Sequence, residues 1–235
     1  MRLRTVYEKL LGWRVLSGPF RGLRYVPEAV GSVHAPKLLG TYESELRPQV
    51  EALVSRAPDL VVNVGAGEGY YAVGLARRLP HARIVAFEAD ARGRDLTGRM
   101  AALNGVGARV EVRGLCALAD LDAALRGAAR PVVVIDAEGA EDPLLDPVRV
   151  PELRRAAILV EVHDFILPEI GDQLLRRFAS THRHQEIWSA PRTARDLPTF
   201  TRLAAYSPWR GQAVRAMDEQ RPGRMRWFWF EPLAS

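Results

Sequence analysis

A glycine-rich stretch from Asp59 to Ala76 (DLVVNVGAGEGYYAVGLA) limits what this chain of 235 residues can fold into. Its first half is an apolar run, which is typical of a buried strand in a parallel sheet. Gly65, Gly67 and Gly69 then allow a sharp turn in which no Cβ keeps a ligand away from the backbone. We expect a helix to begin after this turn, with its free N–H groups directed at whatever occupies the turn.

The spacing of these glycines distinguishes between two kinds of cofactor. A dinucleotide fingerprint requires its third glycine three positions after the second, and Tyr70 stands at that position. The turn therefore disfavours a pyrophosphate. An NAD-dependent oxidoreductase remains an alternative, but it is the less favoured class of enzyme.

Length and composition indicate a single core domain with terminal additions. The one cysteine, Cys116, excludes an internal disulfide framework and favours a reducing compartment. The first twenty residues carry several charges, and no apolar run is long enough for a signal peptide or a membrane span. We therefore expect a cytoplasmic protein with no membrane association.

The net charge of +5 is weak evidence for nucleic-acid binding, because the basic residues are spread over the whole chain. Of the 33 basic residues, only Lys9 and Lys37 are lysines, which fits a GC-rich coding sequence better than a binding surface. Nucleic acid is thus not the expected partner. A non-catalytic module that binds nucleic acid or protein remains the alternative to an enzyme.

Residues 1–57 are expected to form a cap on the core. The patterns predict a short helix at 5–11, a hairpin within 13–26 and a helix at about 42–55, whose start Pro48 could shift to about Leu46. The core, 58–235, alternates strand and helix signals, with helices at 91–103, closed by Asn104-Gly105, and at 169–179. This alternation demands a mostly parallel sheet with right-handed crossovers.

The last two expected strands, 184–190 and 225–232, resemble a hairpin with a long insertion at about 190–225. The insertion is too long for a plain connection. With Tyr206, Trp209 and several arginines, it is either a lid over an acceptor pocket or a basic solvated segment.

Acidic residues follow the expected strands at their carboxyl ends, where open α/β sheets bind ligands. Glu88 ends the second strand, 19 residues after Gly69, where a carboxylate can accept hydrogen bonds from both ribose hydroxyls. Two further expected strands carry polar residues at their ends. The fourth is followed by the acids Asp136, Glu138, Glu141 and Asp142, and the fifth brings Glu161, His163 and Asp164 to the same edge. Strand alternation places Glu161 and His163 on the same face.

Five segments resemble the FkbM-type branch of class I S-adenosylmethionine (SAM)-dependent methyltransferases. They are VVNVGAGEGYYAVGLA, VAFEAD, LNGVGARVEV, VIDAEGAE and LVEVHD. The resemblance runs from about Leu38 to Asp164, includes LLGTYESEL as a lead-in, and is most specific at Asp136 to Glu141. It departs from the family at Asn63, where an acid is usual; an amide offers hydrogen bonds to the cofactor's amino group but no charge. The last third of the chain matches only as an architecture.

This resemblance implies a Rossmann-like, seven-stranded and mostly parallel sheet with helices on both faces, whose last strand is antiparallel and lies beside the fifth. It also implies SAM as the cofactor, with Cys116 near the adenine ring. The implied cofactor-binding residues are Asn63, Gly65, Ala66, Gly67, Gly69, Glu88, Ala89, Cys116 and Asp136.

Methyl transfer is an in-line displacement at a carbon activated by sulfonium, so the protein mainly has to align the acceptor and exclude water. A hydroxyl acceptor must also lose a proton, which requires a base such as His163, or Asp136 or Glu161 with a raised pKa. Glu138 is a further catalytic candidate. We therefore expect O-methylation of a hydroxyl on a sugar or another small metabolite.

A divalent metal is another way to lower the pKa of an acceptor hydroxyl. Asp136, Glu161, and His163 or Asp164 could supply its oxygen and nitrogen ligands. Carboxylates at strand ends also serve as simple hydrogen-bond acceptors, so both interpretations stay open.

Overall fold

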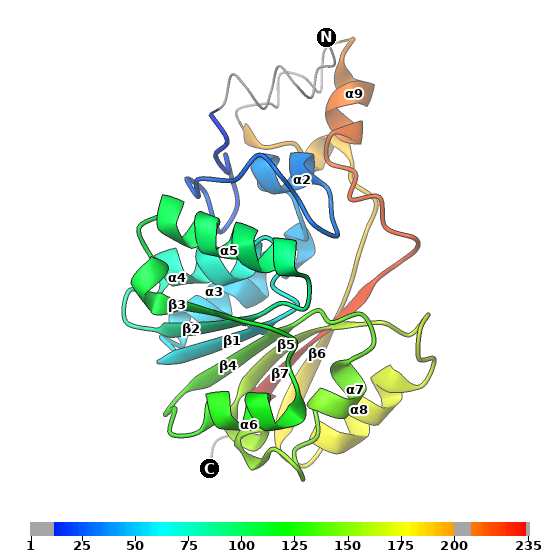
Figure 1. Cartoon of the computed structure of the whole chain (residues 1–235). Coiled ribbons are helices and arrows are strands. Elements are labelled where there is room, and N and C mark those ends of the chain that lie inside the picture. The colour runs from blue at the N-terminus through cyan, green and yellow to red at the C-terminus, as the bar shows by residue number, and fades with distance from the viewer. Residues whose placement is uncertain (1–11, 200–207, 234–235) are drawn as a thin grey trace.

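The computed structural model describes residues 12–199 and 208–233 of the chain. Seven strands form one sheet in the order β3-β2-β1-β4-β5-β7-β6 (Figure 1). The strands are β1 (Leu60–Val64), β2 (Arg83–Phe87), β3 (Val110–Arg113), β4 (Pro131–Ile135), β5 (Ala157–Val162), β6 (His182–Trp188) and β7 (Arg226–Pro232). All pairs are parallel except those of β7 with β5 and β6. The expected fold, including the last strand beside the fifth, is confirmed.

Helices cover both faces of the sheet (Figure 1). One face carries α3 (Arg47–Ser55), α4 (Tyr70–Arg78) and α5 (Ala91–Leu103), and the other carries α6 (Leu118–Leu125), α7 (Glu141–Leu144) and α8 (Ile170–Phe178). Each layer has its own buried apolar cluster. Because both faces are covered, every residue of β1, β4 and β5 is buried, which explains why these strands are almost entirely apolar in the sequence, with Asn63 and Glu161 as the polar exceptions. The third strand is short, because the 3-10 helix Gly107–Arg109 comes immediately before it.

The described residues before β1 pack on the α4 side of the sheet. The expected hairpin appears as backbone pairing around the bridge between Arg14 and Arg24, without extended strands. A helix that the sequence patterns did not predict, α2 (His34–Leu39), follows, and α3 begins at Arg47 after the 3-10 helix Ser44–Leu46. The helix expected at 5–11 lies outside the described residues. The division at residue 57 remains a prediction.

The connection between β6 and β7 lies against this N-terminal segment (Figure 1). It contains the 3-10 helix Ala194–Asp196 and α9 (Arg210–Arg215). Leu197 and Met217 from the connection are buried against Leu39 of α2. The described parts of the connection are therefore anchored at Leu197 and Met217, while α9 has no buried residue. Tyr206 lies outside the described residues, and the choice between a lid and a solvated segment remains a prediction. None of the described helices combines the length and apolar character needed to cross a membrane.

The contact between the N-terminal segment and α4 can be tested at Gly74. A Cβ at this helical glycine would lie 2.6 Å from the Phe20 ring, which is itself buried. We predict that Gly74→Ala destabilises the protein by about 1–3 kcal/mol, because the ring must shift. Urea unfolding measures the change.

The matched control is Gly98→Ala in α5, where a Cβ would meet no atom within 4 Å. Alanine should stabilise this helix by about 0.5–1 kcal/mol, since glycine is the poorer helix former. Equal effects of the two substitutions would contradict the packing of Phe20 on α4.

Candidate functional site

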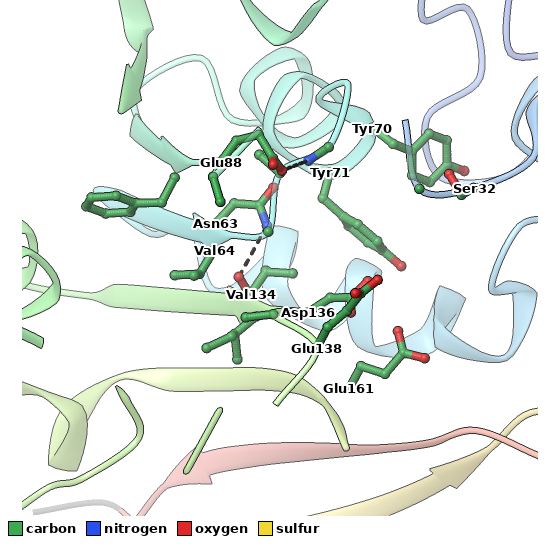
Figure 2. A pocket seen from close by; sticks show the side chains of 18 of the residues that line it. Ser32, Asn63, Val64, Tyr70, Tyr71, Glu88, Val134, Asp136, Glu138 and Glu161 are labelled. Atoms are coloured by element: carbon green, nitrogen blue, oxygen red, sulfur yellow. Dashed lines mark hydrogen bonds between the residues drawn. The ribbon is translucent and has the colours of Figure 1, made fainter. Parts of the chain in front are cut away.

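A cavity of about 320 Å³ opens at the carboxyl ends of the central strands (Figure 2). Its walls come from the glycine turn, the ends of β2, β4 and β5, and the segment around α2 and Glu43. Eight of the nine expected cofactor residues line it: Asn63, Gly65, Ala66, Gly67, Glu88, Ala89, Cys116 and Asp136. Gly69 does not line it. A Cβ on Gly69 would lie 3.2 Å from Thr97 of α5, so this glycine serves helix packing instead.

The glycine turn is held against two strand ends. The N–H groups of Gly65 and Ala66 donate to the carbonyl of Phe87 at 2.9 and 3.0 Å. Gly65 has a φ of +76°, and a Cβ there would lie 1.7 Å from the carbonyl oxygen of Asp136. Only glycine fits this position, because both the backbone angle and the close approach exclude a side chain.

Glu88 is fixed at the cavity wall by backbone donors (Figure 2). Its Oε2 accepts from the N–H of Gly67 at 2.6 Å, and its Oε1 accepts from the N–H of Asp90 at 2.8 Å. Each oxygen keeps further acceptor capacity, which suits a vicinal diol. Glu88 lies at the end of β2, where the sequence placed it, and its ribose role remains a prediction.

Asn63 presents an unsatisfied acceptor at the cavity. Its side-chain N–H₂ donates to the carbonyl of Val134 at 3.2 Å, whereas its Oδ1 is buried without a hydrogen-bond partner. The residue is only 2% exposed. A buried acceptor without a donor costs about 1–3 kcal/mol, so a ligand with an N–H group at this point would remove a penalty.

A buried charge network that the sequence analysis missed closes the turn from the N-terminal side. Glu68, within the glycine stretch, accepts hydrogen bonds from Tyr25 at 2.5 Å, from Lys37 at 2.5 Å and from the N–H of Val30 at 3.2 Å. Burial opposes the ionised form of Glu68, but Lys37 overcomes this effect, and the pKa of the carboxyl is lowered. The only signals for this network in the sequence were the rarity of lysine and the acid between two glycines.

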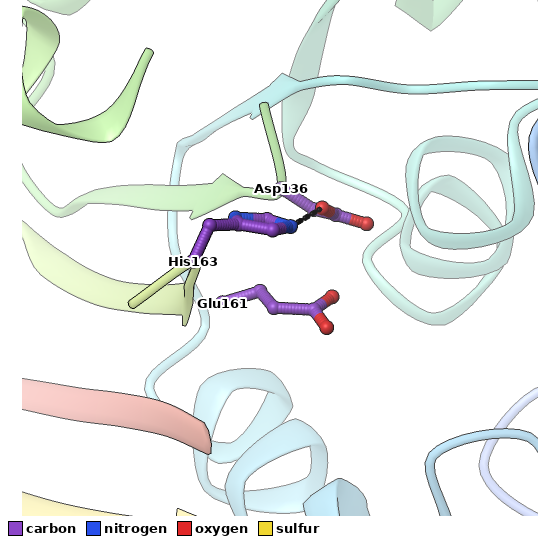
Figure 3. A group of neighbouring side chains, drawn as sticks. All are labelled: Asp136, Glu161 and His163. Carbon is purple, nitrogen blue, oxygen red and sulfur yellow. Dashed lines mark ion pairs between the residues drawn. The ribbon is translucent and has the colours of Figure 1, made fainter. Parts of the chain in front are cut away.

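Three side chains from the ends of β4 and β5 meet at the other end of the site (Figure 3). Asp136, Glu161 and His163 each place one nitrogen or carboxylate oxygen that could ligate a metal within 4.8 Å of the others. Asp136 and Glu161 line the cavity, whereas His163 lies behind Asp136, with its Nε2 3.5 Å from Asp136 Oδ1. The expected gathering of these three residues is confirmed.

Glu141 orients His163 from the protein interior. This fully buried carboxylate accepts from His163 Nδ1 at 2.9 Å and from the N–H groups of Ala137 and Gly139 at 3.0 and 2.8 Å. An ionised carboxylate only accepts hydrogen bonds, so Nδ1 must carry the proton and Nε2 faces Asp136. Glu141 was expected within the acidic segment after the fourth strand, but no role was predicted for it.

The electrostatics of this cluster reflect the crowding of acids around the buried Glu161, whereas the side chain of Asp136 stays 44% exposed. Burial raises the pKa of Asp136, and Glu141 and Glu138 add to the rise, against His163 and Arg221. Burial, with Asp136 and Glu43, raises the pKa of Glu161 to about 10. For His163, burial favours the neutral ring, but Glu141 outweighs it and the pKa is raised.

Arg221, from the connection between β6 and β7, was also missed. Its guanidinium donates to Glu161 at 2.5 Å and to Glu43 at 2.6 Å, and it lies 4.8 Å from the centre of the Trp227 ring. Glu219 bonds the same arginine at 2.9 Å and accepts from the N–H of Glu43 at 3.0 Å. The connection therefore reaches the back of the residues that line the cavity.

The remaining acids have other positions. Asp142 forms an ion pair with Arg177 at 2.8 Å, and Asp164 binds Arg226 through both oxygens at 2.6 and 2.8 Å. Asp164 is therefore engaged with Arg226 and does not belong to the group of three side chains formed by Asp136, Glu161 and His163. Glu138 is exposed on the loop after β4 and lines the cavity.

No protein-family model matches the sequence, and no curated protein is significantly similar to it. Solved structures share its fold at low identity. The O-methyltransferase of tomaymycin synthesis from Streptomyces achromogenes, in complex with SAM, is 19% identical over 79% of this chain and 80% of that one, with a TM-score of 0.51. A precorrin-6y C5,15-methyltransferase from Geobacter metallireducens is 11% identical over 78% and 87%, with a TM-score of 0.52.

A third structure, precorrin 8w decarboxylase from Methanobacterium thermoautotrophicum, is 16% identical over 88% of this chain and 95% of that one, with a TM-score of 0.54. At such identities the likeness establishes the fold, a Rossmann-like fold shared with methyltransferases. Because these proteins carry names for two kinds of reaction, the reaction of this chain has to be argued from its own site.

The pair of Lys37 and Glu68 allows a test of how the site wall is held. We predict that Lys37→Met and Glu68→Gln each destabilise the protein by about 3–5 kcal/mol. The first leaves the buried Glu68 carboxylate without its cation, and the second leaves the buried Lys37 ammonium without its anion. The double variant should lose less stability than the sum of the two single variants.

The same pair predicts a pH dependence of the folding free energy. Since the pKa of Glu68 is lowered in the folded protein, the pair stabilises the fold at pH values above the pKa of an unfolded glutamate. This contribution is lost as the pH falls through the folded pKa.

The control for this cycle is the exposed pair of Arg78 and Glu51, whose nitrogen and oxygen atoms are 2.8 Å apart. Glu51→Gln should change the free energy of unfolding by at most about 1 kcal/mol. Additive effects of Lys37→Met and Glu68→Gln in urea unfolding would show that the two side chains do not interact.

Proposed function

We propose that this protein is a SAM-dependent methyltransferase, and the observation that carries the proposal is the cavity between the glycine turn, Glu88 and Asn63. The turn offers backbone that a ligand can approach closely, Glu88 offers two acceptors for the ribose, and Asn63 offers a buried acceptor for an N–H group. These groups match three parts of one cofactor. The volume of about 320 Å³ falls within the range of small-molecule sites, about 300–1,000 Å³.

The charge of the cavity supports SAM further. SAM carries a sulfonium and an ammonium group, and Glu43, Asp136 and Glu161 place carboxylates along one side of the cavity. The structure of the Streptomyces O-methyltransferase, which shares the fold, contains SAM. Cys116 and Ala89 line the part of the cavity past β2 and β3, where we place the adenine.

The acceptor site is assigned to the end of the cavity formed by Asp136, Glu161 and His163. We infer O-methylation of a hydroxyl on a small molecule, such as a sugar, because these groups can take up or displace the hydroxyl proton. The connection between β6 and β7, anchored through Arg221, would then shield the acceptor from water, as a lid does. The same proposal includes membership of the FkbM-type branch and a cytoplasmic location. It also includes a catalytic role for Glu138, which lines the cavity.

Two alternatives from other classes predict different behaviour. An NAD-dependent oxidoreductase would need room for a pyrophosphate, and Tyr70, which is buried at the third-glycine position, fills part of that space. A non-catalytic module that binds nucleic acid would show affinity that falls steeply with salt. SAM binding that is insensitive to salt would separate the proposal from the second alternative.

Glu88 provides the test of the cofactor pose. We predict that Glu88→Gln weakens SAM binding by about 10- to 100-fold, because the ribose loses hydrogen bonds to a charged acceptor, each contributing about 1.5–3 kcal/mol. Isothermal titration measures the affinity. Glu111→Gln, on the neighbouring strand β3 and outside the cavity, should bind SAM as the wild type does; equal losses in both variants would contradict the pose.

His163 provides the test of the acceptor end. With an acceptor identified from a panel of hydroxylated metabolites and methyl-labelled SAM, we predict that His163→Ala lowers turnover by about 10²- to 10⁴-fold. SAM affinity should be retained, because His163 does not line the cavity. His184→Ala, an exposed histidine of β6, is the control. Unchanged turnover in His163→Ala would remove this residue from the mechanism.

A further inference from the structure

The cluster at the ends of β4 and β5 has the form of a ligand set for a metal ion. Asp136, Glu161 and His163 come from the ends of two adjacent strands, and one potential ligand atom of each lies within 4.8 Å of the others; Figure 3 shows the His163 ring directed at Asp136, with the Glu161 side chain beside them. Glu161 and His163 are nearly fully buried, at 3% and 4% exposure. Such residues are costly to bury unless a partner satisfies them.

The polar atoms of this cluster lack partners on the side where they meet. Among the described residues, no side-chain or backbone group donates a hydrogen bond to the Asp136 carboxylate, and His163 Nε2 lies 3.5 Å from its Oδ1. Glu161 receives one bond, from Arg221 to Oε1, and its Oε2 receives none from the described residues. Each of the three residues therefore keeps a free ligand atom.

The ring of His163 is prepared for metal binding by its other nitrogen. Its Nδ1–H donates to Glu141 at 2.9 Å, and Glu141 is itself fixed by two backbone N–H groups. Histidines that ligate metals usually donate the second ring N–H to a carboxylate or carbonyl, which fixes the tautomer and orients the ring. This arrangement leaves the Nε2 lone pair pointing into the cluster.

The charges around the cluster leave room for a cation. The acidic groups that face it are Asp136, Glu161, Glu43 and Glu138, with Glu141 behind His163, and the one arginine in contact with them among the described residues is Arg221. Arg221 is already shared with Glu43 and Glu219. The acids therefore outnumber the permanent positive charges in this part of the described structure.

We propose that Asp136, Glu161 and His163 bind a divalent transition-metal ion, with Glu141 as the positioning residue behind His163. One imidazole nitrogen and two carboxylate oxygens suit Mn²⁺, Fe²⁺ or Zn²⁺ better than Mg²⁺ or Ca²⁺, which favour oxygen ligands alone. The site lies at the acceptor end of the cavity. A metal ion there would lower the pKa of an acceptor hydroxyl that it coordinates. This catalytic role rests on the proposed function, whereas the binding of the ion does not.

Mn²⁺ titration of the full chain without cofactor tests the site. Binding removes the electron paramagnetic resonance signal of free Mn²⁺, and we expect one saturable site per chain. His163→Ala and Asp136→Asn should abolish saturable binding, and Glu141→Gln should weaken it by about 10- to 100-fold. Mg²⁺ should compete only at concentrations far above those of Mn²⁺.

The matched controls remove the same kinds of group elsewhere. His184→Gln removes an exposed imidazole of β6, and Asp95→Asn removes a carboxylate that is 67% exposed on α5. Both should bind Mn²⁺ as the wild type does. Circular dichroism establishes that each variant is folded, and electron spin echo detection of a coupled imidazole nitrogen in the wild type tests the ligand set without any variant.

No saturable Mn²⁺ binding by the wild type, equal binding by His163→Ala, or absence of nitrogen coupling would overturn the site and leave the cluster as a hydrogen-bonded proton acceptor. These results are independent of SAM. Mn²⁺ binding without SAM binding would contradict the proposed function alone, and SAM binding without Mn²⁺ binding would contradict this inference alone.

Discussion

The close approach of the glycine turn to the end of β4 is the contact on which the site depends. With a Cβ at Gly65 only 1.7 Å from the Asp136 carbonyl oxygen, any other residue would push the turn and the strand apart. Because β1 and β4 are neighbours in the sheet, this contact places the ligand-facing backbone of one strand end opposite the carboxylate of the next. The cofactor cavity and the acidic cluster therefore lie next to each other at the carboxyl ends of these two parallel strands.

Buried charges then attach the segments that complete the walls. Lys37 joins the N-terminal segment to Glu68 in the glycine turn, and Arg221 joins the connection between β6 and β7 to Glu161 and Glu43. A buried ion pair contributes little net stability compared with apolar packing, but breaking one is costly. We infer that these pairs specify where the two segments lie, and that the apolar contacts of Phe20 and Leu39 supply most of the packing energy.

Local patterns predicted what local interactions determine. The helix Ala91–Leu103 was predicted with its bounds, because Asp90 caps its start and Asn104-Gly105 ends it. Asp136, Glu161 and His163 were expected to meet, because parallel strands end at one edge of the sheet. The pairs of Lys37 with Glu68 and of Arg221 with Glu161 join residues 31 and 60 positions apart, and nothing in the intervening sequence records them. For the same reason, Asp164 could not be separated from the cluster until its contact with Arg226 was visible.

Calorimetric titration of the purified chain with SAM, S-adenosylhomocysteine and NAD tests most directly whether the cavity is a SAM site. We predict micromolar binding of the first two, with one site per chain, and no binding of NAD. Binding of NAD in preference to SAM would contradict the argument from the glycine spacing. Binding of none of the three would contradict the assignment of the cavity formed by Gly65, Asn63 and Glu88.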